Sequence, residues 1–393
     1  MATESAIKPA IRRVVTGIDE RGRSKVLWDS PAPNSRSMDG SAASLLSDIW
    51  VWAESPAPLY GERDDGNMKY DFPGPPEGGH VRVIRSSGRP ENYDPAKDQN
   101  AVAMHDPKPL PSGRTWDRGG RNAFTTDMHK TQSIDYAIEL VGERDLGMDD
   151  GNHTIRQGDI VVQVGAWHQW IRNNAAGSTM MYDMFAAKFT DGPQGIAQGN
   201  DAVMTFDGRA LPPGAKTARR VVTIDRVPNK GSVIADGPAP DVRTDPARPG
   251  FMVSRLWVTD GSPAKIVNET LHLPHAIEPP EKGSVLRVYN FPPDKAWQGR
   301  VGRADVDAYF KAMGSPAAST WSAQAPHPYM QKTRTLDICA VLEGEIALVL
   351  DTREVKLAAG DVVVQRGTNH AWSNRSDKPA VVSVASHDGK YAP

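Results

Sequence analysis

Short runs in which β-branched and aromatic residues alternate with polar ones recur along the chain. Clusters of Gly, Pro, Asn and Asp separate these runs, a pattern typical of strands joined by tight turns. The first half of the chain predicts strands over residues 13–16, 24–28, 48–53, 81–85, 133–141, 145–148, 153–155, 160–164, 167–172 and 179–189. Strands this short and this closely spaced predict small antiparallel barrels or jelly rolls.

Two segments depart from the strand pattern. Residues 303–313 (RADVDAYFKAM) form the better of the helix candidates, whereas residues 90–126 show little regularity beyond a helical turn or two near 96–104. The second segment is expected to be a long loop or lid. The predicted fold class is therefore all-β with a few short helices.

The strand pattern occurs twice. The segment GDIVVQVGAWHQWIRN at 158–173 returns as GDVVVQRGTNHAWSN at 360–374, and matched residues such as His168 and His370 lie 202 positions apart without a gap. Further upstream, RRVVT at 12–16 returns at 219–223. The repeat predicts a duplicated unit, with an N-terminal arm at 1–11, a first domain at 12–189, a linker at 190–218 and a second domain at 219–393.

Composition narrows the functional classes. The chain has 393 residues, which suits two cores better than one, and its 46 Lys and Arg nearly balance its 48 Asp and Glu. Without a basic run, nucleic acid is not an expected partner. The single cysteine, Cys339, and a start that lacks signal-peptide features favour a cytoplasmic setting, and no apolar run approaches the roughly 18 to 20 residues of a membrane span.

The repeated segment carries a motif that resembles the second motif of the cupin superfamily, GxxxxxPxGxxHxxxN. In the second copy Gly360, Gly367, His370 and Asn374 match it, with Arg366 in place of Pro. The first copy matches at Gly158, Gly165 and His168, has Val164 in place of Pro, and brings Asn173 one residue late. The amino-acid sequence around both copies is similar to that of a small-cupin subfamily of quercetin-dioxygenase-like proteins.

This resemblance implies a bicupin, that is, two tandem jelly-roll barrels fused in one chain. It also implies that the barrels pack as single-unit cupins do in their dimers, through β-rich faces and exchanged N-terminal arms. Trp50, Trp52 and Trp257 are expected in the core between sheets, because tryptophan on a short strand usually packs. Function follows less directly, because one fold hosts many activities.

Cupins that bind a metal take two histidines and a glutamate from a first motif and a third histidine from the second. Aligned on that pattern, His129 takes the first histidine place, Thr131 the second, Asp135 the glutamate place and His168 the last. Two imidazoles and one carboxylate suit non-haem Fe(II), and Mn, Ni or Zn would also accept them. The resemblance thus implies a divalent metal ion in the first domain, held by His129, Asp135 and His168.

Geometry sets a condition on this ligand set. A straight strand would hold His129 and Asp135 roughly 20 Å apart, so the chain must turn within residues 130–133 for both to reach one ion. Asp135 is also one carbon shorter than glutamate and can instead hydrogen-bond to an imidazole or a water. Two other interpretations stay open: a metal-free acid/base pair of Asp135 and His168, or structural roles for all three residues.

The second domain retains fewer candidates. Gln331 stands in the place of His129, which leaves Asp337 and His370 as the counterparts of Asp135 and His168. These three residues are expected to be vestigial, and no metal is expected there. The second domain would then support the first rather than carry chemistry.

The sequence therefore predicts a metal-dependent, dioxygenase-like oxidoreductase that acts on a small oxygenated organic molecule, such as an aromatic or polyketide-derived one, with Thr131, Trp167 and Trp170 at the substrate. One alternative is a metal-free lyase, decarboxylase or isomerase that uses His168 and Asp135 as acid and base. Another is a non-catalytic binding or storage protein, which predicts a barrel plugged by side chains at His168. The expected partner is a small-molecule substrate, and the chain is expected to be a monomer or a homodimer.

Overall fold

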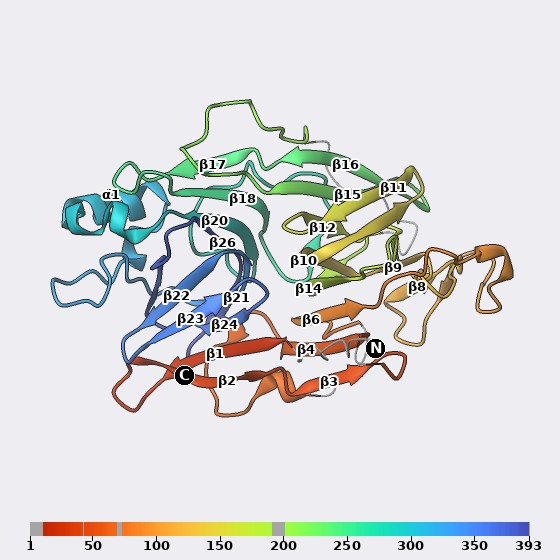
Figure 1. Ribbon diagram of the computed structural model, residues 1–393, viewed down its shortest axis with the longest axis horizontal. Coiled ribbons are helices and arrows are strands. Elements are labelled where there is room, and N and C mark those ends of the chain that lie inside the picture. Colours follow the sequence, from red (N-terminus) through yellow and green to blue (C-terminus); the bar gives the residue numbers. More distant parts are fainter. Residues whose placement is uncertain (1–10, 42, 69–72, 191–200, 393) are drawn as a thin grey trace, which may run out of the picture.

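The computed structural model describes residues 11–41, 43–68, 73–190 and 201–392, and it is dominated by β-strands (Figure 1). The expected N-terminal arm, apart from Ile11, and part of the expected linker lie outside these ranges. The helix expected at 303–313 is confirmed as α1 (Arg303–Ala312). Short 3-10 turns are η1 (Asp65–Asn67), η2 (Pro95–Lys97), η4 (Asp294–Ala296), η5 (Gln298–Arg300) and η6 (Pro316–Ala318). The all-β fold class is thereby confirmed.

Two large sheets make up most of the molecule. The first contains, in pairing order, β17 (Asp241–Thr244), β18 (Met252–Thr259), β20 (Ser284–Phe291), β26 (Ala380–Lys390), β21 (Thr335–Glu343), β24 (Val362–Arg366), β1 (Arg12–Ile18) and β2 (Ser24–Pro31), with β5 (Ala57–Pro58) beside β26. A small sheet of β23 (Glu354–Ala358), β22 (Glu345–Leu350) and β25 (His370–Ser373) completes the C-terminal half.

The second large sheet has the same plan. It contains, in pairing order, β16 (Lys230–Pro238), β15 (Arg219–Val227), β12 (Ile160–Val164), β10 (Ser133–Met148), β14 (Ser178–Lys188), β6 (Gly79–Ser86), β4 (Leu45–Trp52) and β3 (Asn34–Ser37), with β11 (Gly151–Arg156), β13 (Gln169–Ile171) and β19 (Ala264–Lys265) at its sides. A further small sheet is formed by β7 (Lys108–Pro109), β8 (Thr115–Asp117) and β9 (His129–Thr131).

The first hairpin of each half of the chain is part of the sheet formed by the other half. β1 pairs in parallel with β24, Arg13 opposite Val362, while β15 pairs in parallel with β12, Arg220 opposite Ile160. In Figure 1 the red β1 lies beside the blue β24, and the green β15 lies beside the yellow-green β12. The exchange expected for the N-terminal arms falls outside the described residues apart from Ile11, and the exchange seen here is made by hairpins. Neither half of the sequence contains its whole sheet.

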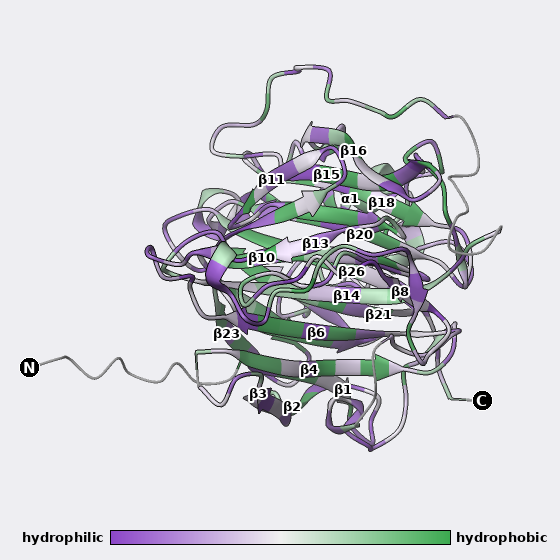
Figure 2. Ribbon diagram, turned by 90° about the vertical axis from the view of Figure 1, so that its right-hand side faces the viewer, coloured by the Kyte–Doolittle hydropathy of each residue, from purple (hydrophilic) through white to green (hydrophobic). Residues whose placement is uncertain are grey.

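A shared core joins the two sheets. Along β10, Ile134, Tyr136 and Ile138 are buried in a cluster that includes Leu256 and Leu286 of the other sheet. Ala137, on the alternate face, belongs to a separate cluster inside the N-terminal half, because successive side chains of a strand point to opposite faces. Figure 2 shows this alternation as green and purple bands along strands such as β4 and β6.

The tryptophans expected between the sheets lie in that core. Trp50, Trp52 and Trp257 are all buried in the shared cluster, which confirms the sequence interpretation. Among the described helices, none is long and apolar enough to cross a membrane.

Candidate functional site

The N-terminal half encloses a cavity of about 360 Å³ on the inner face of its sheet. This volume is in the range of small-molecule sites. The lining residues are Met38, Asp39, Ser44, Arg82, Ile84, Ser86, Phe124, Thr125, Thr126, His129, Asp135, Arg144, His168, Trp170, Ile171, Arg172, Tyr182 and Met184. Four of the residues selected from the sequence, His129, Asp135, His168 and Trp170, are among them.

The two histidines are brought together by a short backbone bridge. The His129 amide donates to the His168 carbonyl at 2.8 Å, and the His168 amide donates back at 3.0 Å. The chain reaches this bridge through a corner at Gly165, whose φ of +55° favours glycine. The imidazole centroids consequently lie 4.3 Å apart.

Hydrogen bonds fix the tautomer of both imidazoles. His129 Nδ1 lies 2.8 Å from the Asp127 carbonyl and His168 Nδ1 lies 2.9 Å from the Ala166 carbonyl, so each Nδ1 carries the proton and donates. Burial lowers the pKa of His129, and burial together with the neighbouring His129 lowers the pKa of His168 further. Both rings are therefore neutral at neutral pH, with a basic Nε2.

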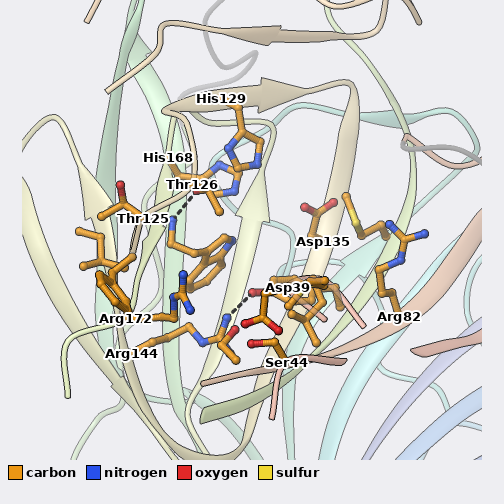
Figure 3. A pocket seen from close by; sticks show the side chains of 18 residues that line it. Asp39, Ser44, Arg82, Thr125, Thr126, His129, Asp135, Arg144, His168 and Arg172 are labelled. Carbon is orange, nitrogen blue, oxygen red and sulfur yellow. Dashed lines mark hydrogen bonds between the residues drawn. The ribbon is translucent and has the colours of Figure 1, made fainter. Parts of the chain in front are cut away.

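Asp135 enters the same cavity from β10. The residue is 5 % exposed, and its Oδ1 atom has no hydrogen-bond partner among the described residues. Burial raises the pKa of Asp135 to about 7, against the lowering effect of a hydrogen bond from Ser133. Figure 3 shows the carboxylate away from the paired imidazoles, on another wall of the cavity.

The expected three-residue ligand set is not assembled. Among the residues that the structure describes, no group of three or more His, Cys, Asp or Glu side chains could hold a metal ion. The reason is local, because β9 continues into β10 after a single bend residue, Gln132, and this bend does not bring Asp135 back to His129 and His168. The residues present therefore do not fit a metal centre with two imidazoles and this carboxylate.

Two of the expected substrate contacts lie elsewhere. Thr131 Oγ1 is buried 3.3 Å from Thr115 Oγ1 and does not line the cavity. Trp167 is fully buried in the shared core, with the Arg118 guanidinium 4.6 Å from its ring, because neighbouring side chains of an extended segment point in opposite directions. Trp170 does line the cavity, edge-on to His168.

A buried arginine of the cavity wall, Arg144, was not among the residues selected from the sequence. Its Nε donates to Glu139 Oε2 at 3.1 Å and its Nη1 donates to Tyr182 Oη at 3.0 Å, all within the buried interior. The sequence pattern that could have identified Arg144 is the strand alternation along β10, which places residues 137 and 139 on the same face as Asp135. A register shift between Glu139 and Val141 then turns Arg144 inward as well.

The C-terminal half has the corresponding cavity, but only about 30 Å³ of it is open. Gln331 Nε2 lies 3.3 Å from His370 Nε2, and Asp337 lines the same space, so the three counterparts are gathered there.

Side chains on β20 fill this second space. Strand pairing shows which residues of the two halves are equivalent. Tyr289 of β20 lies opposite Val382, and Ile84 of β6 lies opposite the equivalent residue, Met180. In the same way, Phe291 lies opposite Ala380 and Ser86 lies opposite Ser178. Aromatic rings in the C-terminal half thus occupy the volume that Ile84 and Ser86 leave open in the N-terminal half.

Comparisons with known proteins agree with a cupin-type chain. Residues 324–386 match the family model described as Cupin domain. Phomopsin biosynthesis cluster protein C' of Diaporthe leptostromiformis is 58% identical over 48 residues, which are 12% of this chain and 25% of that protein. Oryzines biosynthesis cluster protein J of Aspergillus oryzae is 48% identical over 50 residues, 12% of this chain and 28% of that protein. The chain thus covers about a quarter of the length of these relatives.

Solved structures resemble the chain only distantly. Protein Ylba from E. coli covers 92% of this chain over 91% of its own length, with 7% identity and a TM-score of 0.36. Oxalate decarboxylase from Bacillus subtilis covers 78% of this chain over 79% of its own length, with 10% identity and a TM-score of 0.30. Likenesses at these scores carry no argument about function. Support for the cupin superfamily therefore comes from the family match and the all-β fold.

Proposed function

We infer that this chain is a bicupin in which the N-terminal half is a proton-transfer enzyme and the C-terminal half is its support. The reaction class is that of a lyase, decarboxylase or isomerase acting on a small oxygenated organic molecule. One observation carries the proposal: a carboxyl group with a pKa of about 7 and a neutral imidazole, Asp135 and His168, line the same cavity.

The two groups suit complementary roles. A general acid or base works best when its pKa lies near the working pH, and burial gives Asp135 that property. His168 Nε2 is the basic nitrogen of a ring whose Nδ1 proton is held by a carbonyl. With a carbonyl compound bound between them, His168 would take a proton from carbon while protonated Asp135 gives one to the carbonyl oxygen. The product of this step is an enol, with the electron pair of the broken C–H bond in its new C=C bond.

The shape of the cavity favours an enzyme over a storage protein. The non-catalytic alternative predicted side chains packed against His168, and in the N-terminal half the space beside His168 is open. The packed arrangement occurs around His370.

A metal-dependent oxidoreductase is the second candidate. The paired imidazoles favour it, because Nδ1 protons held by carbonyls leave Nε2 as the nitrogen that ligates metals. The position of Asp135 away from them does not favour it.

The test begins with metal analysis of the purified full chain. The protein is then incubated in D₂O with a panel of small oxo acids and hydroxy acids, and carbon-bound hydrogen exchange or CO₂ release is followed by NMR. The proposal predicts turnover without stoichiometric metal, lost in Asp135→Asn and in His168→Gln, and retained in the matched variant Asp337→Asn. Turnover that depends on one bound metal ion per chain would contradict it.

A further inference from the structure

We propose that Arg144 is the anchor for a substrate carboxylate, and that the N-terminal cavity selects small acids with an apolar or aromatic body. This inference rests on the proposed function and specifies its substrate class. Three observations support it: an unsatisfied guanidinium donor, a second arginine on the same cavity wall, and an apolar surface beside it.

The guanidinium of Arg144 is only partly satisfied. Its Nε and Nη1 groups have the protein partners Glu139 and Tyr182, whereas Nη2 is buried and has no hydrogen-bond partner among the described residues. The side chain is 4 % exposed and lines the cavity, as Figure 3 shows. Because a buried charged donor without a partner is costly, an acceptor inside the cavity would stabilise this arrangement.

Charge on this wall favours an anionic acceptor. Burial raises the pKa of Glu139 to about 8, more than the neighbouring Arg144 lowers it, so this carboxyl is a weaker counter-charge for Arg144 than an exposed glutamate would be. Arg172 lines the same cavity, where the Asp39 carboxylate lies near enough to attract it, and its guanidinium donates to Ser87 Oγ at 3.0 Å and to the Ala123 carbonyl. A carboxylate can accept two parallel hydrogen bonds from a guanidinium, and such pairs are strong.

The rest of the cavity suits an apolar body. Phe124, Ile171, Trp170 and Met184 contribute apolar surface to the lining, and Trp170 stands edge-on to Tyr182 with ring centroids 5.6 Å apart. A ligand held by its carboxylate at Arg144 would lie along these side chains toward the imidazoles and Asp135. The matching residue of the C-terminal half is Ile346, which is packed in that half's core.

Binding measurements on the full chain test the proposal. The probes are benzoate, phenylacetate and 3-phenylpropionate, each paired with its neutral amide, and affinities are measured by calorimetry. At least one acid should bind the wild type about 10- to 100-fold more tightly than its amide. Arg144→Met should remove this preference while leaving affinity for the amide within a factor of about three, and Arg144→Lys should keep part of it.

The controls separate this inference from the proposed function. Arg156→Met changes an exposed arginine on the neighbouring β11 and should leave the acid preference intact. Asp135→Asn should bind the acid but not turn over substrate. If the wild type and all variants were inactive but the wild type still preferred the acid, the proposed enzymatic function would be refuted and the role of Arg144 would stand. The anchor is refuted if none of the acids outbinds its amide, or if Arg144→Met and Arg144→Lys weaken acid and amide equally.

Discussion

Replacing Asp135 with asparagine removes one ionisable group and changes the side-chain shape very little. In the wild type, burial raises the pKa of this carboxyl from 3.8 to about 7. At about 1.4 kcal/mol per pH unit, holding the carboxylate ionised in the folded protein costs about 4 kcal/mol above pH 7. Asparagine avoids this cost, so Asp135→Asn should be the more stable protein at high pH.

The sign follows from proton linkage. Between pH 4 and pH 7 the folded protein keeps the Asp135 proton while the unfolded chain loses it, so wild-type stability falls as pH rises through this window. Below pH 4 both states are protonated and the contribution disappears. The free energy of unfolding of Asp135→Asn minus that of the wild type should therefore increase by about 4 kcal/mol from pH 4 to pH 8.

Urea unfolding of both proteins at closely spaced pH values measures this difference, and other titrating groups cancel because they are common to both. A direct reading comes from the carboxyl carbon resonance of Asp135 in ¹³C-labelled protein, assigned by its loss in the variant. A difference that stays flat between pH 4 and pH 8, or a carboxyl that titrates near pH 4, would refute the argument for a buried acid in this cavity.

Three further changes probe the cavity, a buried ion pair away from it, and the corner at Gly165. Ser86→Phe adds the ring that the C-terminal half has at this position, and it should weaken binding of an aromatic acid at least tenfold in calorimetry; unchanged affinity would contradict the strand equivalence. Arg220→Met leaves Glu269 buried without its 2.9 Å partner and should lower the free energy of unfolding by about 3–5 kcal/mol in urea, so a loss below 1 kcal/mol would oppose it. Gly165→Ala places a Cβ 2.7 Å from the Phe189 ring at a positive φ, and calorimetry should show a Tm several degrees lower; an unchanged Tm would argue against the corner.

The local pattern was sufficient for most strands. The run at 160–164 and the helix starting at Arg303 are where alternation and helical spacing predicted them. Residues 133–141 and 145–148, predicted as two strands, form one continuous strand, β10, in which Gly142 adopts a φ of +81°. A backbone bend at glycine can keep a strand paired on both sides, and the sequence around Gly142 resembles a turn.

The candidate site was harder to predict because it depends on which distant strands pair. Asp135 and His168 reach one cavity through the fold, as the motif implied, but the separation of Asp135 from the imidazoles follows from the short bend at Gln132. Whether the cavity is open or filled depends on Ser86 in one half and Phe291 in the other. These two residues are recognised as equivalent only from the pairing of β6 and β20 with their neighbouring strands. The 202-residue offset of the motif copies does not align these two residues, which lie 205 positions apart.

The decisive measurement is a crystal structure of the full chain with the tightest-binding acid, recorded with anomalous data at the edges of Fe, Mn, Ni and Zn. We expect the carboxylate at about 2.7–2.9 Å from the Arg144 guanidinium, with the ligand body extending to His168 and Asp135 and no metal peak between these residues. An anomalous peak ligated by His129, His168 and a reoriented Asp135 would contradict this expectation.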